Sequence, residues 1–305
     1  MRILHTSDWH VGKRLGRFDR MAEHRAALAE VRAVAERERV DLVIVAGDLF
    51  DRPMPPIEAL DAVVEALLAL AAPQRPVVAI AGNHDSPELF EVLAPLLAPR
   101  GVHLVGSIRR PDAGGVLELA AGEGGQRALV ACLPFLREGR VVDFLDDVDS
   151  WYGQYADKIA RLCRAYNDEL ARRARDRDDA VTVLAAHFIV SGARLGGDGA
   201  PRGERQLHIG EAYTATESSM PPDVQYVALG HVHAPQPVPG ALVAAQYAGS
   251  LLELDFGEAG ETKRVVIVEV EPGVPASTRS VALTAGRRLQ RARGREQALL
   301  PRAHA

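Results

Sequence analysis

The sequence predicts an α/β fold, and three observations carry this prediction. Strands and helices alternate from the first residues onward. Several strands are continuous apolar runs, which is typical of strands that are covered on both faces. Polar residues gather directly after these strands, where α/β sheets bind their ligands. The 305 residues are 47% apolar and 25% charged, a globular composition that excludes wholesale disorder and collagen.

In the first half of the chain, strands and helices follow each other regularly. Apolar runs such as VDLVIVA predict the strands, and apolar side chains spaced three and four residues apart predict the helices. Pro87 stands in the first turn of one helix, a position that proline favours. The strands expected here span residues 2–6, 40–46, 76–81 and 102–105, and the helices span 20–39, 56–72 and 87–98.

The second half has one long helix and several strands without helices between them, which suggests mixed sheets in two layers. Residues 188–210 are rich in glycine and polar residues, and we expect a long functional loop there. Residues 271–280 are expected to be a linker. We therefore expect one domain over 1–270, followed by the linker and a short basic tail over 271–305. The other expected elements are a helix over 151–176 and strands over 126–132, 181–186, 226–229, 241–247 and 264–270.

The charge and the cysteines narrow the classes of function. Lys and Arg number 36 against 41 Asp and Glu, so the net charge of −5 excludes binding of nucleic acid by overall charge. An acidic protein that handles phosphate needs local cations, and bound metal is one source. Cys132 and Cys163 lie in no CxxC motif, which excludes a zinc ribbon. The sequence has no secretory signal and no apolar run long enough to span a membrane, so we expect a cytoplasmic protein.

Five of the expected strands end in residues of the types that bind metal ions. In DWH and HVH both polar side chains can face one ion, because residues i and i+2 of an extended chain point the same way. A glycine stands before Asp48, Asn83 and His231 and allows a sharp turn there. The candidate ligands are Asp8, His10, Asp48, Asn83, His187, His231 and His233.

These seven side chains are too many for one ion. Mixed Asp, Asn and His ligands suit Mn, Fe or Zn better than Ca or Mg. A bridging aspartate with about four ligands for each ion describes a two-metal site. The charge of two divalent ions exceeds that of Asp8 and Asp48, so such a site attracts phosphate and makes water more acidic. The residues alone therefore predict hydrolysis of a phosphoester.

Each motif also has a plainer interpretation. A single Asp-x-His, or a single Gly-Asp after a strand, is a weak signal, and His187 alone also fits a core histidine. GNHD and GHVH are stronger signals, because short turns dense in ligand residues serve no packing purpose. The other histidines have no such partners in the sequence, and we expect no metal role for them: His5, His24, His103, His208 and His304.

Together the motifs D-x-H, GD, GNHD, H and GHxH resemble the signature of the calcineurin-like metallophosphoesterases. The segments HTSDWHVGKRLGRFDR, AGDLFDRPMPP, AGNHDSPELF and YVALGHVHAPQP further resemble the SbcD family of bacterial nucleases, over about residues 1–290. The resemblance implies a four-layer α/β/β/α sandwich, in which two mixed sheets are flanked by helices.

The resemblance also implies a role for each site residue. Asp48 would bridge two manganese ions. His84 would be the catalytic histidine that contacts the scissile phosphate and helps the leaving oxygen depart, and Asp85 would favour its protonated form. One ion would be held by Asp8, His10, Asp48 and His233, and the other by Asp48, Asn83, His187 and His231.

The implied activity is a Mn-dependent exonuclease that degrades duplex DNA in the 3′ to 5′ direction. Endonuclease action on single strands and hairpins is also implied, in DNA repair, recombination and replication. The implied partners are DNA, an SbcC-type SMC-like ATPase, and a second copy of the chain that contacts residues 56–72 and 87–98. Contacts to DNA phosphates are expected from Lys13, Arg14, Arg17, Arg52 and Arg205.

The C-terminal segment departs from the family pattern. Family members usually continue past the LTAGR segment into a small capping domain and a region that binds the ATPase. About twenty residues follow LTAGR here. We therefore expect residues 271–305 to hold only a remnant of the capping domain.

Two alternatives remain open. The motifs alone also fit a metallophosphodiesterase or phosphatase that acts on non-DNA substrates, and only the segments between the motifs favour DNA. The other alternative is a non-catalytic scaffold that keeps the fold as a binding surface. Lost ligands would mark such a protein, and no ligand is lost here.

Overall fold

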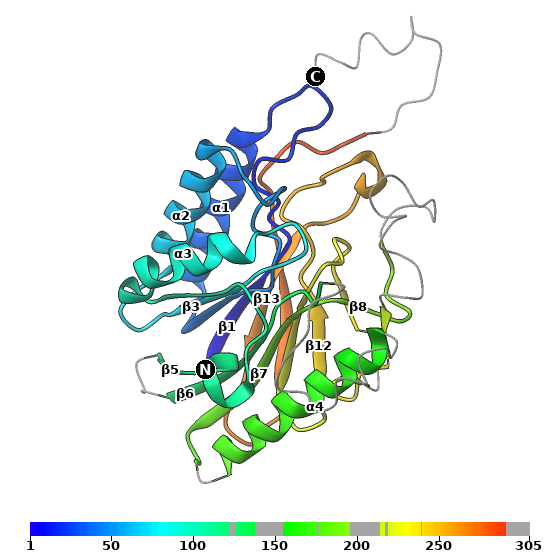
Figure 1. The fold of residues 1–305 in the computed structure, drawn as a ribbon. Coiled ribbons are helices and arrows are strands. Elements are labelled where there is room, and N and C mark those ends of the chain that lie inside the picture. The colour runs from blue at the N-terminus through cyan, green and yellow to red at the C-terminus, as the bar shows by residue number, and fades with distance from the viewer. Residues whose placement is uncertain are drawn as a thin grey trace, which may run out of the picture.

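Two six-stranded sheets lie face to face between helices (Figure 1). This arrangement is seen in a computed structural model of the chain. The described parts of the chain are residues 1–122, 126–137, 155–175, 177–195, 214–216, 219–238 and 240–290.

The first sheet has the strand order β14-β13-β1-β2-β3-β4. Its strands β1 to β4 run parallel, and β13 and β14 add an antiparallel pair at the β1 edge. The strands are β1 (Arg2–Thr6), β2 (Leu42–Val45), β3 (Val77–Ile80), β4 (Val102–Val105), β13 (Arg264–Glu269) and β14 (Ser277–Ala282). The helices that cover its outer face are α1 (Met21–Arg37), α2 (Ile57–Leu70) and α3 (Pro87–Leu97), and the turn η1 (Ala98–Arg100) follows α3.

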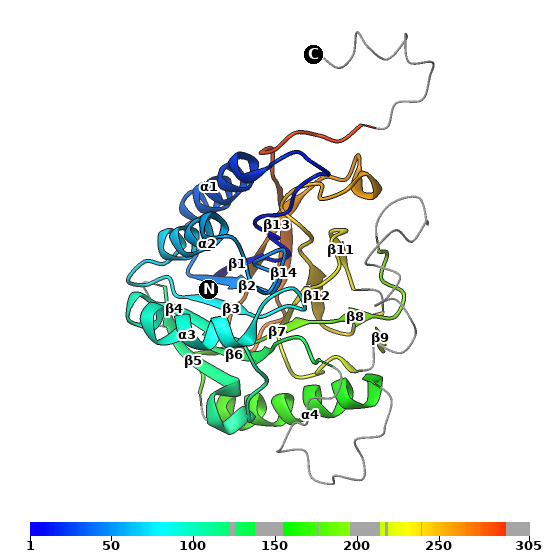
Figure 2. The same cartoon turned by 45° about the horizontal axis from the view of Figure 1, so that its top comes forward.

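The second sheet has the order β11-β12-β10-β7-β6-β5 and is parallel except at its two edges. The helix α4 (Tyr155–Ala174) packs on its outer face (Figure 2). Its strands are β5 (Val116–Ala121), β6 (Gln126–Leu133), β7 (Ala180–His187), β10 (Tyr226–Gly230), β11 (Gln236–Pro237) and β12 (Ala244–Tyr247). The smaller elements are the strand pair β8 (Ile189–Val190) and β9 (Thr214–Ala215), and the single turns η2 (Pro111–Gly115) and η6 (Phe256–Glu258).

The alternation of side chains along β1 and β2 explains the four layers. Ile3 and Ile44 point into the core between the two sheets, where they meet residues such as Val183 of β7. Leu4 and Val43 point the other way, into the core under α1 and α2. Successive residues of a strand face opposite sides, so an uninterrupted apolar strand fills both cores. The expected four-layer α/β/β/α sandwich is confirmed.

Two elements differ from the sequence-based expectation. The strand β5 lies between two glycine-rich turns where no strand was expected. The expected linker is also wrong, because residues 277–282 form β14, which pairs with β13 along its whole length. The first sheet therefore continues past the expected domain boundary at residue 270. The tail over 291–305 and most of the loop over 188–210 lie outside the described residues.

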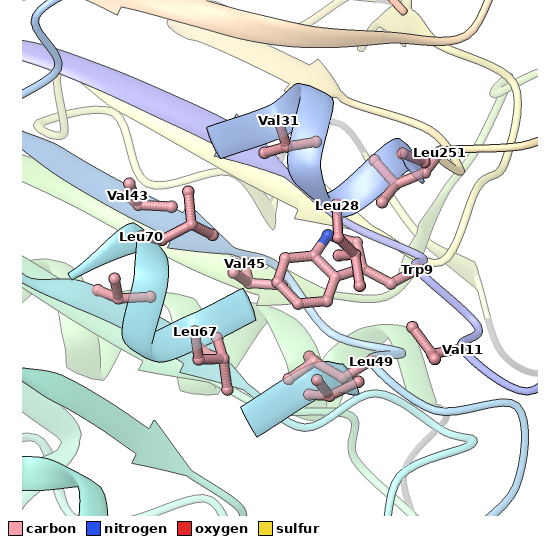
Figure 3. Packing of buried hydrophobic residues seen from close by; sticks show 14 of the residues in the cluster. Trp9, Val11, Leu28, Val31, Val43, Val45, Leu49, Leu67, Leu70 and Leu251 are labelled. Carbon is pink, nitrogen blue, oxygen red and sulfur yellow. The ribbon is translucent and has the colours of Figure 1, made fainter. Parts of the chain in front are cut away.

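Trp9 anchors the segment that follows β1 (Figure 3). Its side chain is fully buried, and it packs in the cluster that contains Leu28 of α1 and Leu67 of α2. The indole Nε1 donates a hydrogen bond to Thr6 Oγ1 at 3.0 Å. Trp9 stands between Asp8 and His10, so its burial directs these two polar neighbours to the opposite side.

The helices were also compared with the length and apolarity that a membrane span needs. Within the described residues, no helix is long and apolar enough to cross a lipid bilayer.

Candidate metal centre

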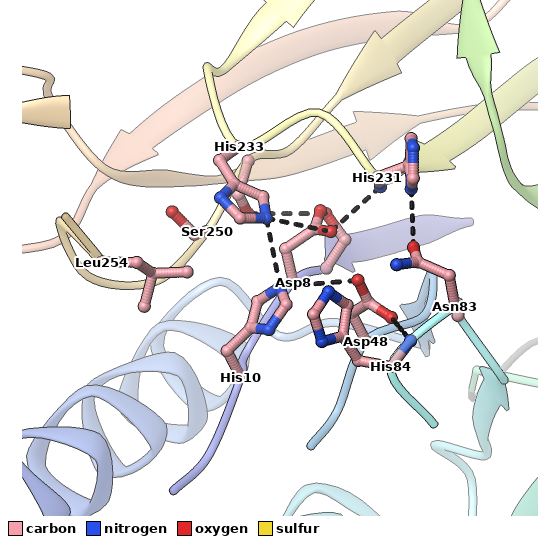
Figure 4. Close-up of polar contacts among 12 residues, drawn as sticks. Asp8, His10, Asp48, Asn83, His84, His231, His233, Ser250 and Leu254 are labelled. Carbon is pink, nitrogen blue, oxygen red and sulfur yellow. Dashed lines mark hydrogen bonds and ion pairs between the residues drawn. The ribbon is translucent and has the colours of Figure 1, made fainter. Parts of the chain in front are cut away.

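The candidate ligands meet where strands of both sheets end (Figure 4). The first sheet supplies Asp8 and His10 after β1, Asp48 after β2, and Asn83 after β3. The second sheet supplies the ligands at the ends of β7 and β10, which are His187, His231 and His233. Parallel strands bring their carboxyl ends to one edge of a sheet, and the face-to-face packing places the two edges together. The structure thus unites all seven residues that the sequence singled out.

Four of these ligands have a backbone conformation that side chains disfavour. The φ angle is 51° at Asp8, 45° at His10, 54° at Asp48 and 86° at His231. Among the other described non-glycine residues, only Arg39 has a positive φ. Strain of this kind concentrates at functional sites, where the surrounding structure holds it in place. The fold therefore gives up some stability to orient these side chains.

Two glycines allow the chain segments of the centre to approach closely. Gly47 has a φ of 93°, and a Cβ there would overlap the ring of His187. A Cβ at Gly230 would overlap the carbonyl oxygen of Ala46. That carbonyl accepts a hydrogen bond from His187 Nδ1 at 2.7 Å, so both glycines protect the position of one histidine.

Asp8, His10 and His233 form the first group of ligands. Their ligand atoms lie within 4.8 Å of one another. The Nε2 atoms of His10 and His233 are 3.1 Å apart, and His233 Nε2 is 4.0 Å from Asp8 Oδ1. Two nitrogens bound to one ion through bonds of about 2.1 Å lie roughly 3 to 3.4 Å apart. The spacing of the two imidazoles therefore fits a shared ion.

Asn83, His187 and His231 form the second group of ligands. Asn83 Oδ1 lies 2.7 Å from His231 Nδ1 and 3.1 Å from His187 Nε2, and the two nitrogens are 3.2 Å apart. These three atoms have the separations expected of ligands around one ion. Asp48 and the two histidines also form a possible metal-binding group.

Asp48 stands between the two groups. Its Oδ2 is 3.4 Å from His10 Nε2 and 3.4 Å from His187 Nε2. Its Oδ1 accepts a hydrogen bond from the backbone N–H of His84 at 2.8 Å. One carboxylate thus faces a histidine of each group, which is the geometry that a bridging ligand needs.

The electrostatics of the centre suit a cation. Burial opposes charge on Asp48, yet the facing histidines, His187 first, hold the pKa of this carboxyl well below its ordinary value. Burial likewise opposes charge on His187, while Asp48 and Asp8 raise the pKa of His187 to about 9. Without a metal, the two residues therefore form a buried ion pair. A metal ion takes the place of the imidazole proton, because ligands bind in their deprotonated form.

His84 lies at the rim of the centre with one nitrogen fixed. Its Nδ1 donates to the backbone carbonyl of Asp51 at 2.9 Å, so its proton-accepting lone pair is on Nε2. The ring centre of His84 is 4.7 Å from that of His10. His84 thus presents Nε2 beside the ligands, where a substrate phosphate would bind.

Asp85 has a different role from the one expected. Its fully buried carboxylate accepts hydrogen bonds from the backbone N–H groups of Leu49, Phe50 and Gly82, at 3.2, 3.0 and 2.9 Å. Burial, and then repulsion from Asp48, raise the pKa of Asp85 to about 6 against these bonds. Asp85 ties the segments after β2 and β3 together, so we treat it as a positioning residue.

The expected DNA-contacting cations lie near the centre in the sequence. Lys13 Nζ is 3.0 Å from an Asp51 carboxylate oxygen. Arg14, Arg17 and Arg52 are exposed, and the Arg17 guanidinium lies 5.3 Å from the centre of the Phe18 ring. Arg205 lies outside the described residues.

The sequence analysis missed one polar contact of the centre. His233 Nδ1 donates to Glu258 Oε1 at 2.8 Å, and Glu258 is fully buried. Glu258 lies in the segment DFGE, where nothing in the letters separates it from a surface glutamate. The only available signal was its place shortly after a ligand-bearing strand.

Three of the histidines for which no metal role was expected lie in the described residues. His5 Nδ1 is 2.9 Å from the Tyr226 hydroxyl, a polar link between the two sheets. His24 Nε2 is 3.4 Å from the Lys13 carbonyl oxygen, and His103 lies in β4. His208 and His304 lie outside the described residues.

Comparisons with known proteins place this site in a family. The family model of the calcineurin-like phosphoesterases matches residues 1–235. The SbcD component of the nuclease SbcCD from Bacillus subtilis is 36% identical over 296 residues, which are 95% of this chain and 71% of that protein. Its counterpart from Rhodobacter capsulatus is 34% identical, over 90% of this chain and 67% of that protein. Among solved structures, a dimetal phosphatase from Danio rerio aligns over 91% of this chain and 98% of that chain, at 14% identity and a TM-score of 0.46.

The chain therefore belongs to the calcineurin-like phosphoesterase family. Within that family, it is similar to the SbcD nucleases over nearly its whole length. It is a metal-dependent phosphodiester hydrolase, and the expected family and class of enzyme are confirmed.

Proposed function

We propose that the chain is a two-metal, Mn-dependent DNA nuclease of the SbcD type. The observation that carries the proposal is Asp48 Oδ2, which stands 3.4 Å from a histidine nitrogen of each ligand group. One ion is held by Asp8, His10, Asp48 and His233, and the other by Asp48, Asn83, His187 and His231. Histidine-rich mixed ligands favour manganese over magnesium.

The residues of the chain divide the work of hydrolysis. Two divalent ions, when bound, supply positive charge that polarises the phosphate and makes water more acidic. His84 holds a proton at Nε2 and delivers it to the leaving oxygen, while the Asp51 carbonyl keeps its ring in place. Asp85 holds together the two segments that carry Asp48 and Asn83.

The proposed substrate is DNA, cut as an exonuclease from 3′ to 5′ on duplexes and as an endonuclease on single strands and hairpins. The similarity to the SbcD nucleases supports this choice. Exposed Arg14, Arg17 and Arg52 follow the first two ligand clusters, where they can meet phosphates without reading sequence. The alternative is a metallophosphodiesterase or phosphatase on non-DNA substrates.

The proposed partners are an SMC-like ATPase of the SbcC type and a second copy of the chain. The relatives are named as components of the SbcCD nuclease, which supports the ATPase in a role in DNA repair and recombination. The helices α2 and α3 lie side by side (Figures 1 and 2). Their large exposed apolar side chains support the dimer: Ile57 is 86% exposed, Val92 64% and Leu96 66%. The expected cytoplasmic location stays a prediction.

A comparison of substrates tests the proposal. The purified chain with Mn²⁺ is offered a DNA hairpin, a small aryl phosphodiester and an aryl phosphomonoester. We expect cleavage of the DNA, and we expect Arg14→Ala with Arg17→Ala to slow it while hydrolysis of the small diester is unchanged. If the small diester is hydrolysed and the DNA stays intact, the alternative takes the place of the proposal.

A further inference from the structure

Glu258 occupies a position in which all of its contacts serve to hold one carboxylate still. Its Oε1 accepts the hydrogen bond from His233 Nδ1 at 2.8 Å. Its Oε2 accepts from Lys263 Nζ at 2.8 Å, from the Leu254 N–H at 3.0 Å and from the Ser250 hydroxyl at 3.2 Å. Ser250 and Leu254 lie beside His233 (Figure 4). A buried charge is tolerated when it is paired and fully hydrogen-bonded, and Lys263 supplies the pairing charge.

The bond to Glu258 determines which nitrogen His233 offers. A carboxylate accepts hydrogen bonds, so His233 Nδ1 carries the proton and Nε2 carries the free lone pair. That Nε2 faces His10 Nε2 at 3.1 Å. An imidazole that donates to a carboxylate is fixed in orientation and is a more basic ligand.

The second ligand group is supported differently. His187 Nδ1 donates to the carbonyl oxygen of Ala46 at 2.7 Å, which is a neutral backbone acceptor. His231 turns Nδ1, and not Nε2, towards Asn83 Oδ1 at 2.7 Å. The carboxylate support of His233 is therefore not repeated at His187, and the two ligand groups are chemically unequal.

We propose that Glu258 is a positioning residue that strengthens the ion held by Asp8, His10 and His233, and that the two metal positions differ in affinity for this reason. The inference rests on the proposed two-metal site. Glu258 does not touch the ion or the substrate. It acts through His233.

The test counts bound Mn²⁺ by isothermal titration calorimetry and by equilibrium dialysis with metal analysis. Glu258→Gln keeps the shape of the side chain and removes its charge. We expect this variant to bind one ion with the affinity of the wild type and the other about 10- to 100-fold more weakly.

The matched control is Glu253→Gln in the same segment. Glu253 is also buried, but its carboxylate binds the backbone N–H of Gly260 at 3.0 Å and lies 3.4 Å from Arg288. It therefore tests the loss of a buried charge without the contact to His233. We expect both ions to bind to this control with the affinity of the wild type.

Lys263 provides a second pair of variants if Glu258→Gln fails to fold. Glu258→Gln with Lys263→Met removes both charges of the pair, and Lys263→Met alone keeps the bond from His233 to Glu258. We expect the double variant to weaken one ion and the single variant to keep both.

The outcomes separate the two levels of the account. If a folded Glu258 variant binds both ions as the wild type does, or weakens both equally, the role of Glu258 is overturned. If the wild type itself binds a single ion, the two-metal site is overturned, and the inference with it.

Discussion

The ligand side chains owe their positions to residues that do no chemistry themselves. Trp9 is buried under α1 and turns its neighbours Asp8 and His10 towards the metal centre. Asp85 binds three backbone N–H groups from the segments after β2 and β3. The four ligands with positive φ would relax without such supports. Supporting residues are therefore as sensitive to substitution as the ligands.

Gly230→Ala tests this sensitivity at one atom. The added methyl group would overlap the Ala46 carbonyl oxygen that holds His187. We expect a loss of about 1–3 kcal/mol in stability and weaker metal binding, measured by chemical denaturation and by Mn²⁺ titration. Gly273→Ala is the control, because its φ of 71° carries backbone strain while no atom lies within 4 Å. Equal metal binding by the two variants would contradict the role of Gly230.

The ligands were predictable from sequence because each follows an apolar strand, and the strand ends meet by the rules of α/β sheets. Glu258 was not predictable, because its partnership with His233 depends on how the segment after β12 folds back. The role of Asp85 was mispredicted for a related reason. Adjacency in GNHD suggested contact with His84, while the backbone turn directs Asp85 to three amides.

At the scale of elements, the segment after β14 is fastened to the helix layer by carboxylates of α1. Glu30 accepts hydrogen bonds from the backbone N–H and hydroxyl of Thr284 and from the N–H of Ala285, at 2.7 to 2.9 Å. Glu23 accepts from the Arg287 guanidinium at 2.6 Å. This segment was expected to begin a tail, and it is instead part of the packed fold.

Glu30→Ala tests the fastening. The variant leaves the amides of Thr284 and Ala285 without their acceptor, so we expect faster hydrogen exchange at these two positions. The expected loss of stability is about 1–2 kcal/mol, since each hydrogen bond contributes roughly 1 kcal/mol. Glu36→Ala removes a glutamate of the same helix that pairs only with exposed Arg32 among the contacts seen, and its exchange at Thr284 should match the wild type. Unchanged exchange in Glu30→Ala would contradict the fastening.

The two strands that the sequence did not predict share a physical cause. β14 is the outermost strand of its sheet, and most of its side chains are exposed. β5 is the outermost strand of the other sheet. Edge strands lack a second neighbour and bury less apolar surface, so STRSVA and VLELAA carry little of the apolar pattern that marks a central strand. The central strands, buried on both faces, were all predicted.

For the whole molecule, the metal centre joins the two halves of the sandwich. One sheet supplies Asp8, His10, Asp48 and Asn83, and the other supplies His187, His231 and His233. An ion bound by both sets links the sheets, and any ligand that binds only the folded state stabilises it.

Metal binding should therefore raise the thermal stability. At a Mn²⁺ concentration of one hundred times Kd, each ion contributes about 2.7 kcal/mol, or roughly 5 °C in Tm for a chain of this size. Differential scanning calorimetry with Mn²⁺ and with a chelator measures the shift. Asp48→Asn should lose most of it, because Asp48 faces a histidine of each group. The same shift in Asp48→Asn would contradict the bridging role.

The exposed apolar side chains of α2 and α3 predict a dimer in solution. A charge placed among them should break it, because charged groups are disfavoured at the centre of an interface. We expect light scattering after gel filtration to give the mass of a dimer for the wild type and of a monomer for Leu96→Glu. Leu242→Glu is the control, as Leu242 is 94% exposed outside these helices. A wild type that stays monomeric at high concentration would contradict this contact.

The central claim is that the paired ligand groups and His84 cut DNA. The most direct measurement is Mn²⁺-dependent cleavage of a labelled DNA hairpin by the wild type, by His84→Ala, and by His103→Ala as a control outside the site. We predict that His84→Ala slows cleavage about 10²- to 10⁴-fold while it still binds two ions, and that His103→Ala cuts like the wild type. Cleavage by His84→Ala at the rate of the wild type would contradict the account.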